Sequence, residues 1–195
     1  MKSPRRRFPR SPAVLLLVAL AAGSAWLAAE AAPARVIRGS GAAASRENRG
    51  DGRLAWHELE PALAEAKRVG KPVMVHVYTD WCGWCKRMDQ STYGQADVRD
   101  YVARKFVPAR VNAEDDRRRA TYEGEDLTYR QFADAFRISR YPTTLFLTPD
   151  GALISQVPGY VKPGPFLGVL QYVAGGHYKT RTYDAYIHDG DVPTP

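Results

Sequence analysis

The feature that most constrains this chain is a pair of cysteines, Cys82 and Cys85, the only two among its 195 residues. They follow Val73–Tyr78, a nearly continuous apolar run that is typical of a strand buried on both faces. Residues 81–93 are expected to form a helix, so the cysteines lie at its first turn. Two intervening residues keep the sulfur atoms of such a pair within reach of a disulfide bond. The sequence therefore predicts a strand, a cysteine pair and a helix, in that order.

A cysteine at the start of a helix lies near unpaired backbone N–H groups and the positive end of the helix dipole, which favour its thiolate form. We therefore expect Cys82 to be the nucleophile, with a thiol pKa lowered from ~8.5 into the range ~3.5–7.5. Cys85 can then attack the mixed disulfide that joins Cys82 to a substrate sulfur. The expected catalytic residues are Cys82 and Cys85, which form a redox-active disulfide and need no organic cofactor or metal.

Two other roles are open to the same pair of cysteines. A static disulfide that spans so few residues would hardly constrain the unfolded chain, so it would add little stability. A zinc site could include His57 or His76, but it would need two ligands besides the cysteines, and the sequence has no second cysteine pair. The context of strand, Cys-x-x-Cys and helix favours thiol–disulfide exchange over both.

Residues 1–31 have the three-part layout of a secretory signal peptide. Residues 1–12 are basic, residues 13–22 are apolar, and Ala29 and Ala31 supply the small residues of a cleavage site after Ala31. The alternative is a retained membrane anchor, since the apolar stretch approaches the ~17 residues of a spanning helix. Paired arginines in the basic part are consistent with twin-arginine export, and Sec export explains the leader equally well. Either route predicts a periplasmic protein, in a compartment where a cysteine pair can be oxidised.

The rest of the chain divides into three parts. Residues 32–53 contain almost no large apolar residue and are expected to form a flexible linker. One folded domain is expected over residues 54–175, and a C-terminal extension over residues 176–195. Five basic residues and one glutamate in the leader account for +4 of the formal charge of +7, which leaves +3 for residues 32–195. This remainder is too small to indicate a nucleic-acid partner.

Hydrophobic periodicity and turn residues predict alternating helices and strands within the domain. Thr128 and Gln131 have the spacing of a capping box, which begins a further helix. Residues 115–124 contain three consecutive arginines among acidic residues, so they are expected to form a solvated loop. The order of elements predicts an α/β architecture, with helices covering a mostly parallel sheet that ends in an antiparallel hairpin. The expected helices are 56–70, 81–93, 96–106 and 163–173, and the expected strands are 73–78, 106–111, 143–148 and 152–157.

With these elements in place, the sequence resembles the thioredoxin superfamily over residues 54–175. Three motifs carry the resemblance: Trp81-Cys-Gly-Trp-Cys-Lys86 after the buried strand, Arg110-Val-Asn112 in the next strand, and Arg140-Tyr-Pro142-Thr143 before the hairpin. The sequence is most similar to exported bacterial thioredoxins of the SoxW type and to the C-terminal domain of DsbD. The resemblance implies a thioredoxin fold, with a mixed sheet flanked by helices, and a thiol–disulfide oxidoreductase.

The resemblance also implies a substrate groove beside the cysteines. Pro142 stands at the position of the family's cis-proline, and the backbone next to Tyr141 would pair with an extended substrate strand. Aromatic side chains would form much of the groove. Its expected residues are Trp81, Gly83, Trp84, Tyr141 and Pro142.

A proton relay is a further implication of the resemblance. His76 stands six residues before Cys82, where many family members carry a buried aspartate, and Arg110 stands where they often carry a lysine. A neutral His76 that accepts the Cys85 proton would move the pH dependence of exchange toward histidine's ordinary pKa of ~6.5. Arg110 would keep its charge, but it could not donate and recover a proton. The other interpretation of His76 is a core histidine that binds a backbone carbonyl.

These expectations favour a monomeric reductase that reduces disulfide-containing exported proteins. A membrane thiol electron donor of the DsbD type would keep it reduced. Gly83 and Trp84 replace the Gly-Pro of cytoplasmic thioredoxins, and loss of that proline commonly accompanies a less reducing couple. A periplasmic disulfide oxidase or isomerase is therefore an alternative, and a redox-silent thioredoxin-fold binding module is another.

Overall fold

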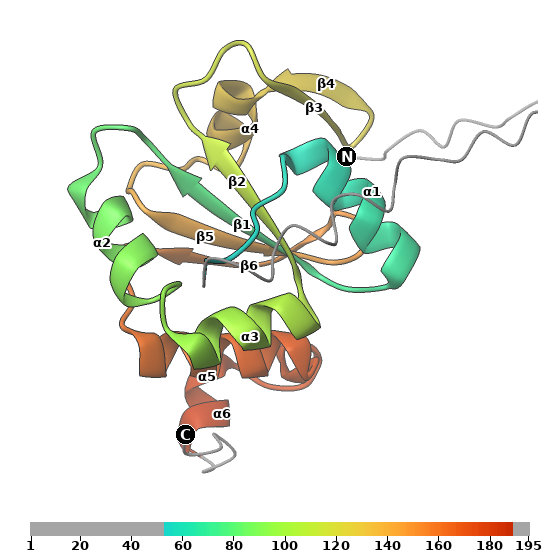
Figure 1. Ribbon diagram of the computed structural model, residues 1–195. Coiled ribbons are helices and arrows are strands. Elements are labelled where there is room, and N and C mark those ends of the chain that lie inside the picture. The colour runs from blue at the N-terminus through green and yellow to red at the C-terminus, as the bar shows by residue number, and fades with distance from the viewer. Residues whose placement is uncertain (1–52, 189–195) are drawn as a thin grey trace, which may run out of the picture. The chain divides into compact units, whose positions relative to one another are not determined.

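A computed structural model describes residues 53–188 (Figure 1). The expected signal peptide and all but the last residue of the expected linker lie outside the described residues. The helices are α1 (Leu59–Val69), α2 (Gly83–Ser91), α3 (Ala96–Lys105), α4 (Tyr129–Ala135), α5 (Pro163–Ala174) and α6 (Tyr183–His188), with a 3₁₀ turn, η3 (His177–Lys179). The strands are β1 (Val73–Tyr78), β2 (Val107–Asn112), β3 (Arg119–Tyr122), β4 (Glu125–Thr128), β5 (Thr143–Leu147) and β6 (Leu153–Pro158).

The main sheet is mixed, with the strand order β2-β1-β5-β6. Strand β1 is parallel to β2 and antiparallel to β5, and β6 is antiparallel to β5. The prediction of a mostly parallel sheet is therefore wrong, because only one of its three strand pairs is parallel. The crossover through α2 and α3 returns the chain to the end where β1 began, and this makes β2 parallel to it. Strand β5 instead enters beside the end of β1, where Thr143 pairs with Val77.

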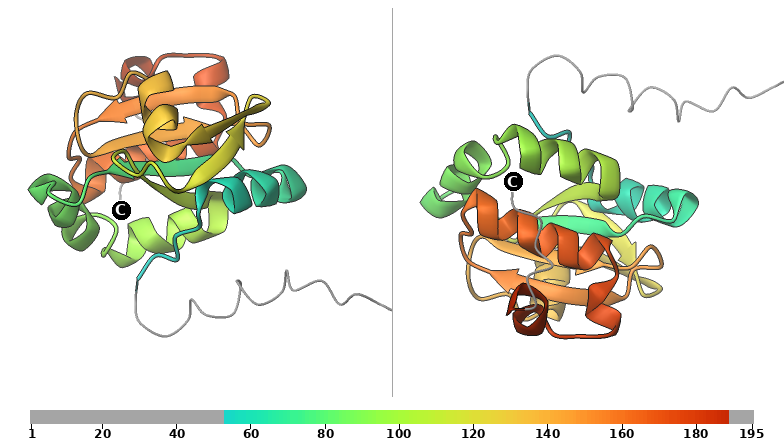
Figure 2. Two further views of the ribbon diagram at one scale, coloured as in Figure 1. Left: turned by 90° about the horizontal axis from the view of Figure 1, so that it is seen from above. Right: turned by 90° about the horizontal axis from the view of Figure 1, so that it is seen from below.

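Different helices cover the two faces of this sheet (Figures 1 and 2). Val73, Val75 and Val77 of β1 pack into one core together with residues of α1 and α4. Met74 points to the opposite face and packs into a second core with residues of α3 and α5. Because successive side chains of a strand alternate between faces, a strand covered on both sides reads as a continuous apolar run. This is why β1 could be predicted residue for residue.

Local signals set the ends of two helices. Helix α1 ends at Gly70, whose φ of 68° lies in the left-handed region that glycine adopts most easily. Helix α4 begins with the predicted capping box, which the structure confirms. The Gln131 N–H donates to Thr128 Oγ1 at 3.1 Å, and the Thr128 N–H donates to Gln131 Oε1 at 2.8 Å. Helix α4 therefore starts at a fixed point after β4.

The arginine-rich segment is partly a strand, so the expectation of a loop over residues 115–124 is wrong for its second half. Strands β3 and β4 form a separate antiparallel hairpin. Ala120 and Tyr122 are buried while Arg119 and Thr121 are exposed, which is the alternation of a half-buried strand. The sequence did not predict this strand, because two apolar residues are too few to establish an alternating pattern beside a run of charged residues.

Residues beyond 175, which were expected only as an extension, pack on helix α5. Tyr186 of α6 is buried against the aromatic rings of Tyr172 and Tyr183. The Tyr172 hydroxyl donates to the Arg181 carbonyl at 2.6 Å. The packed structure therefore continues at least to residue 188. No helix within residues 53–188 has the length and apolar character needed to cross a membrane.

Candidate functional site

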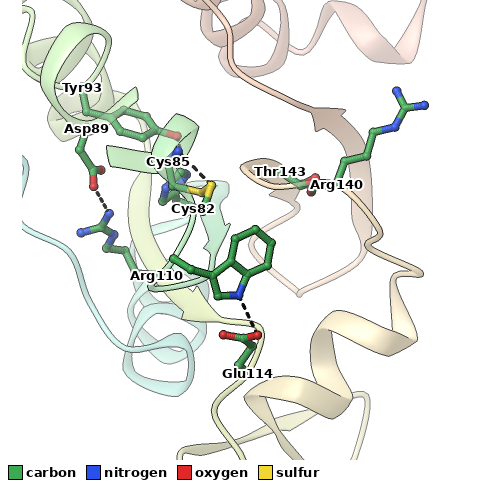
Figure 3. Close-up of a disulfide and its surroundings, with 10 residues drawn as sticks. Cys82, Cys85, Asp89, Tyr93, Arg110, Glu114, Arg140 and Thr143 are labelled. Carbon is green, nitrogen blue, oxygen red and sulfur yellow. Dashed lines mark hydrogen bonds and ion pairs between the residues drawn. A yellow bond between two sulfur atoms is a disulfide. The ribbon is translucent and has the colours of Figure 1, made fainter. Parts of the chain in front are cut away.

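The two cysteines form a disulfide at the start of α2 (Figure 3). Cys82 is the N-cap residue of the helix and Cys85 lies in its first turn, with 5.3 Å between their Cα atoms. The exposed fractions of Cys82 and Cys85 are only 3% and 2%. The structure thus brings the predicted pair together, in its oxidised form, at the predicted place in the fold.

Cys82 Sγ lies where helix α2 can stabilise negative charge. The Cys85 backbone N–H donates to it at 3.0 Å, and Sγ lies at the positive end of the helix dipole. A sulfur in this position is a better hydrogen-bond acceptor as a thiolate than as a thiol. The geometry therefore favours ionisation of Cys82 once the disulfide is reduced.

Exposed aromatic rings flank the nearly buried disulfide. Trp81 is 67% exposed and Trp84 is 58% exposed. Trp81 meets Tyr141 edge to face at a centroid distance of 6.0 Å, whereas Trp84 lies 5.5 Å from Tyr160. The expected groove residues therefore separate into two groups, and Tyr160 is an addition that the sequence did not indicate.

The loop before β5 completes the surface on the side of Tyr141. The Tyr141–Pro142 peptide bond is cis. Thr143 Oγ1 donates to the Arg140 carbonyl, and the Gly159 N–H donates to the Pro142 carbonyl, both at 2.7 Å. These two hydrogen bonds fix the loop to its own strand and to the end of β6.

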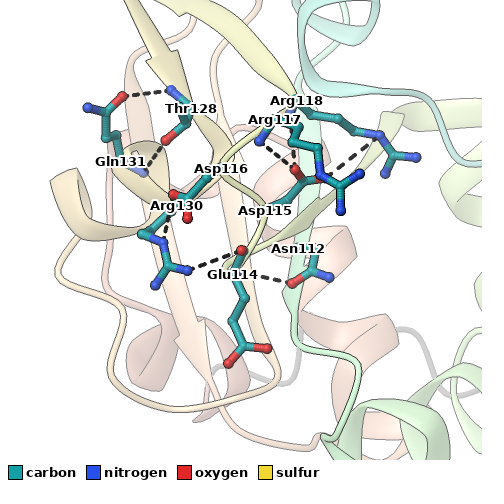
Figure 4. Close-up of polar contacts among 9 residues, drawn as sticks. All are labelled: Asn112, Glu114, Asp115, Asp116, Arg117, Arg118, Thr128, Arg130 and Gln131. Atoms are coloured by element: carbon teal, nitrogen blue, oxygen red, sulfur yellow. Dashed lines mark hydrogen bonds and ion pairs between the residues drawn. The ribbon is translucent and has the colours of Figure 1, made fainter.

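Glu114 holds the indole ring of Trp81 from a different part of the chain. The Trp81 ring N–H donates to Glu114 Oε1 at 2.9 Å (Figure 3). The Glu114 backbone is fixed in turn, since its N–H donates to Asn112 Oδ1 and its carbonyl accepts from Arg130 (Figure 4). No local pattern could have indicated this contact, because 33 residues separate the two side chains.

His76 lies in the second core, on the same face of β1 as Met74. It is fully buried, and its Nδ1 is 3.1 Å from the Tyr93 hydroxyl, which is also 3.2 Å from Thr144 Oγ1. The partner is therefore a hydroxyl group and not the backbone carbonyl that the core interpretation expected. Burial, together with the positive charge of Arg110, lowers the pKa of His76 to about 3.

This low pKa bears on the expected proton relay. A base with a pKa of about 3 accepts a proton from a thiol only at a cost of several kcal/mol, since each unit of pKa difference is about 1.4 kcal/mol. The relay role of His76 thus stays a prediction that its surroundings oppose. A pH–rate profile that is unchanged in His76→Ala would exclude it.

Arg110 connects strand β2 to the cysteine helix. It is the register partner of His76 on β2, but its guanidinium forms an ion pair with Asp89 of α2 (Figure 3). The guanidinium also lies over the rings of Trp56, at 5.0 Å, and Tyr78, at 4.8 Å. Asp89 follows Cys85 by one helical turn, so the pair ties the helix to the sheet close to the disulfide.

A pocket of about 520 Å³ lies along the same flank of α2. Its lining includes Lys86 and Asp89 from the helix, Arg110 from β2, and the rings of Trp56 and Tyr93. It therefore places charged groups one turn from the cysteines. No group of three His, Cys, Asp or Glu side chains within residues 53–188 is positioned to hold a metal ion.

Replacing Arg110 by alanine is expected to lower the free energy of unfolding by about 1–2 kcal/mol, as measured by urea denaturation. Asp89 Oδ2 would lose its Arg110 partner. Asp89 Oδ1 is buried and has no hydrogen-bond partner in the described chain, so the carboxylate would then be left without a partner there. Arg68→Ala is the control, because its solvent-exposed pair with Glu65 should contribute much less to stability. Equal losses in the two variants would contradict a structural role for the Arg110–Asp89 pair.

The fold and the site together define a class of protein. A Cys-x-x-Cys disulfide at the start of a helix, on a mixed sheet with helices on both faces, is the arrangement of thioredoxin-like proteins. The chain belongs to the thioredoxin-like domain family, whose model matches residues 59–174. The expected fold class, a thioredoxin fold with a mixed sheet flanked by helices, is confirmed.

Individual relatives agree with this family. The chain is 31% identical over 116 residues to the thiol:disulfide interchange protein DsbD of Yersinia enterocolitica, an alignment that covers 58% of this chain and 18% of the relative. Among solved structures, a thioredoxin from Thermus thermophilus is 27% identical with a TM-score of 0.51, over 62% of this chain and 86% of that one. A thioredoxin-fold protein from Helicobacter pylori is 20% identical with a TM-score of 0.56, over 62% and 84%. The chain thus spans less than a fifth of the length of its curated DsbD relative.

Proposed function

We propose that this protein is an exported thiol–disulfide oxidoreductase that reduces disulfides of periplasmic proteins through Cys82 and Cys85. The observation that carries the proposal is the position of Cys82 Sγ at the start of α2, 3.0 Å from the Cys85 N–H. The name of the Yersinia relative, a thiol:disulfide interchange protein, supports the same chemistry. The redox group is the cysteine pair itself, and the proposed reaction uses no organic cofactor or metal.

The reaction proceeds in two exchanges of sulfur partners. The Cys82 thiolate attacks one sulfur of the client disulfide, and the other client sulfur leaves as a thiolate that takes up a proton. Cys85 then loses its thiol proton and attacks Cys82 Sγ, which releases the first client sulfur as a second thiol. The client disulfide gains two electrons and two protons, and the protein dithiol becomes the Cys82–Cys85 disulfide that the structure contains.

A further turnover requires reduction of this disulfide. We propose a membrane thiol electron donor of the DsbD type for this step and a monomer as the active form. Export fits the leader at residues 1–31, and the disulfide is compatible with an oxidising compartment. The clients are disulfide-containing exported proteins.

The direction of electron flow is tested by equilibrating the protein with glutathione buffers and measuring the fraction of oxidised protein. A reductase is expected to have a potential near the thioredoxin value of about −270 mV, whereas a strong oxidase of the DsbA type lies near about −120 mV. We expect the first result. A value near the second would reverse the proposed direction while leaving the exchange chemistry intact.

Clients can be identified by stopping the reaction after its first step. Cys85→Ala removes the resolving thiol, so we expect mixed disulfides to accumulate on Cys82 in cells and to disappear on treatment with dithiothreitol. The double variant Cys82→Ser/Cys85→Ala is the matched control, because it lacks the attacking thiolate. Equal trapping by the two variants would show that the adducts do not arise from Cys82.

A further inference from the structure

The aromatic surface around the disulfide carries opposite charges at its two ends. One end is formed by Trp81 and Tyr141, and the other by Trp84 and Tyr160. Trp81 immediately precedes Cys82 and Trp84 follows it in the first turn of α2, so each end adjoins the sulfur that a client cysteine must reach. The proposed function makes this arrangement relevant to the choice of client.

The end at Trp81 and Tyr141 is acidic. The Glu114 carboxylate accepts the neutral N–H of Trp81, and no cation within residues 53–188 forms an ion pair with it. Arg130 donates to the Glu114 backbone carbonyl and forms its ion pair with Asp116, so its charge is shared between Asp116 and the more distant Glu114 carboxylate (Figure 4). Burial raises the pKa of Tyr141, the negative charges of Asp134 and Glu114 raise it further, and the positive charge of Arg130 offsets part of this rise. The negative charge of Glu114 is therefore available to a bound client.

The end at Trp84 and Tyr160 is basic. The Arg87 guanidinium lies 5.6 Å from the ring centroid of Trp84 and 5.9 Å from that of Tyr160. Arg87 is exposed, and it forms no ion pair with an acidic residue in the described chain. Lys86, also exposed, precedes it on the same helix. This end therefore presents a guanidinium held against two aromatic rings.

Two other charged residues lie near the disulfide in the sequence or in space. The Arg140 side chain points away from the disulfide (Figure 3), so it does not cancel the acidic end. Asp80 is exposed and immediately precedes Trp81, which adds negative charge to the same end. The separation of charge therefore persists when these neighbours are included.

We propose that the site selects client disulfides within extended segments that carry a basic residue on one side of the attacked cysteine and an acidic residue on the other. The basic side chain contacts the Glu114 carboxylate and the ring of Trp81, which combines an ion pair with a cation–π interaction. The acidic side chain pairs with Arg87. Backbone pairing beside Tyr141 sets the direction of the client strand, so the order of the two charges decides which segments fit, and this inference rests on the proposed reductase activity.

The test compares two peptides of identical composition and reversed charge order. Each contains one cysteine, with lysine on one side and glutamate on the other, and is supplied as its disulfide-linked homodimer. A third peptide, neutral on both sides, serves as reference. The full-length protein is reduced, freed of reductant and mixed with each peptide, and the appearance of the Cys82–Cys85 disulfide is followed by mass spectrometry after acid quenching. The two protein thiols are oxidised as the peptide disulfide is reduced to two thiols.

We expect one charge order to react about threefold to tenfold faster than the other at low ionic strength, and the ratio to shrink as salt is added. A ratio of one at low salt would overturn the proposal. If the neutral peptide is not reduced at all, the proposed function itself fails, so the two failures are distinguishable.

Two variants assign the preference to its residues. Glu114→Gln keeps an oxygen acceptor for the Trp81 N–H but removes the charge, and Arg87→Gln removes the charge at the other end. Each is expected to bring the ratio of the two rates toward one, and the double charge reversal Glu114→Lys/Arg87→Glu is expected to invert it. Glu65→Gln on α1 is the matched control, which should keep the wild-type ratio. A ratio that survives both Gln variants would contradict the assignment.

Discussion

Acidification from pH 6.5 to pH 4.5 is expected to remove about 2 kcal/mol from the free energy of unfolding through His76 alone. In the folded protein the pKa of His76 is lowered to about 3 by burial and by the charge of Arg110. In the unfolded chain it returns to about 6.5. Because the folded value is the lower, the unfolded state takes up the proton first. The contribution of neutral His76 to the free energy of unfolding is therefore complete above pH 6.5. It is lost as the pH falls toward 3, at about 1.4 kcal/mol per pH unit.

Urea denaturation of the wild type and of His76→Asn at several pH values between 7 and 4.5 measures this contribution. Asparagine can keep a hydrogen bond to the Tyr93 hydroxyl but does not titrate, so its stability should depend less on pH. Protonation of other carboxylates also destabilises the folded protein in acid. Asp115 is an example, because the backbone N–H groups of Arg118 and Arg117 donate to it and lower its pKa. These effects occur in both proteins and cancel in the difference. Parallel pH profiles for the two proteins would contradict a neutral, buried His76.

The parts of the fold that the sequence predicted well are those that depend on neighbouring residues. Strand β1 shows as a continuous apolar run because both its faces are covered. The end of α1 at Gly70 and the start of α4 at Thr128 follow from capping chemistry within one turn. The cysteine pair is predictable for the same reason, since its disulfide needs only a helix start and a spacing of three residues.

The rest of the site depends on contacts between distant segments. Glu114 reaches Trp81 across 33 residues, and Arg110 reaches Asp89 across 21. Nothing in the local sequence marks such a partner, because many charged residues are equally able to form an exposed hydrogen bond. The direction of β5 in the sheet has the same origin, since it depends on the path of the chain through the β3–β4 hairpin and α4. Of the residues in these two contacts, only Asp89 could have been placed from local sequence. It follows Cys85 by four residues, and this spacing puts both on one face of the helix.

Cys82→Ser is expected to lower the rate of disulfide exchange by about three orders of magnitude or more. A serine hydroxyl in the same position is not ionised near neutral pH, so the helix start has no thiolate to stabilise. Cys85→Ser is the matched control: it leaves the attacking sulfur and its backbone N–H donor in place, so the first exchange should persist while the release of client stops. Comparable first-step rates for the two variants would contradict the assignment of Cys82 as nucleophile.

The same asymmetry should be visible in the wild-type dithiol without any client. The Cys85 N–H and the dipole of α2 act on Cys82 Sγ, so the pH dependence of its alkylation by iodoacetamide should have a midpoint below the ordinary thiol value of about 8.5. Cys85 lies three residues further along, inside the helix and away from the N-cap position that favours the Cys82 thiolate, so it should be alkylated much more slowly. A midpoint for Cys82 at or above the ordinary value would mean that the helix start does not stabilise the thiolate. Attack by Cys82 at neutral pH would then lack its physical cause, because only the ionised sulfur is nucleophilic.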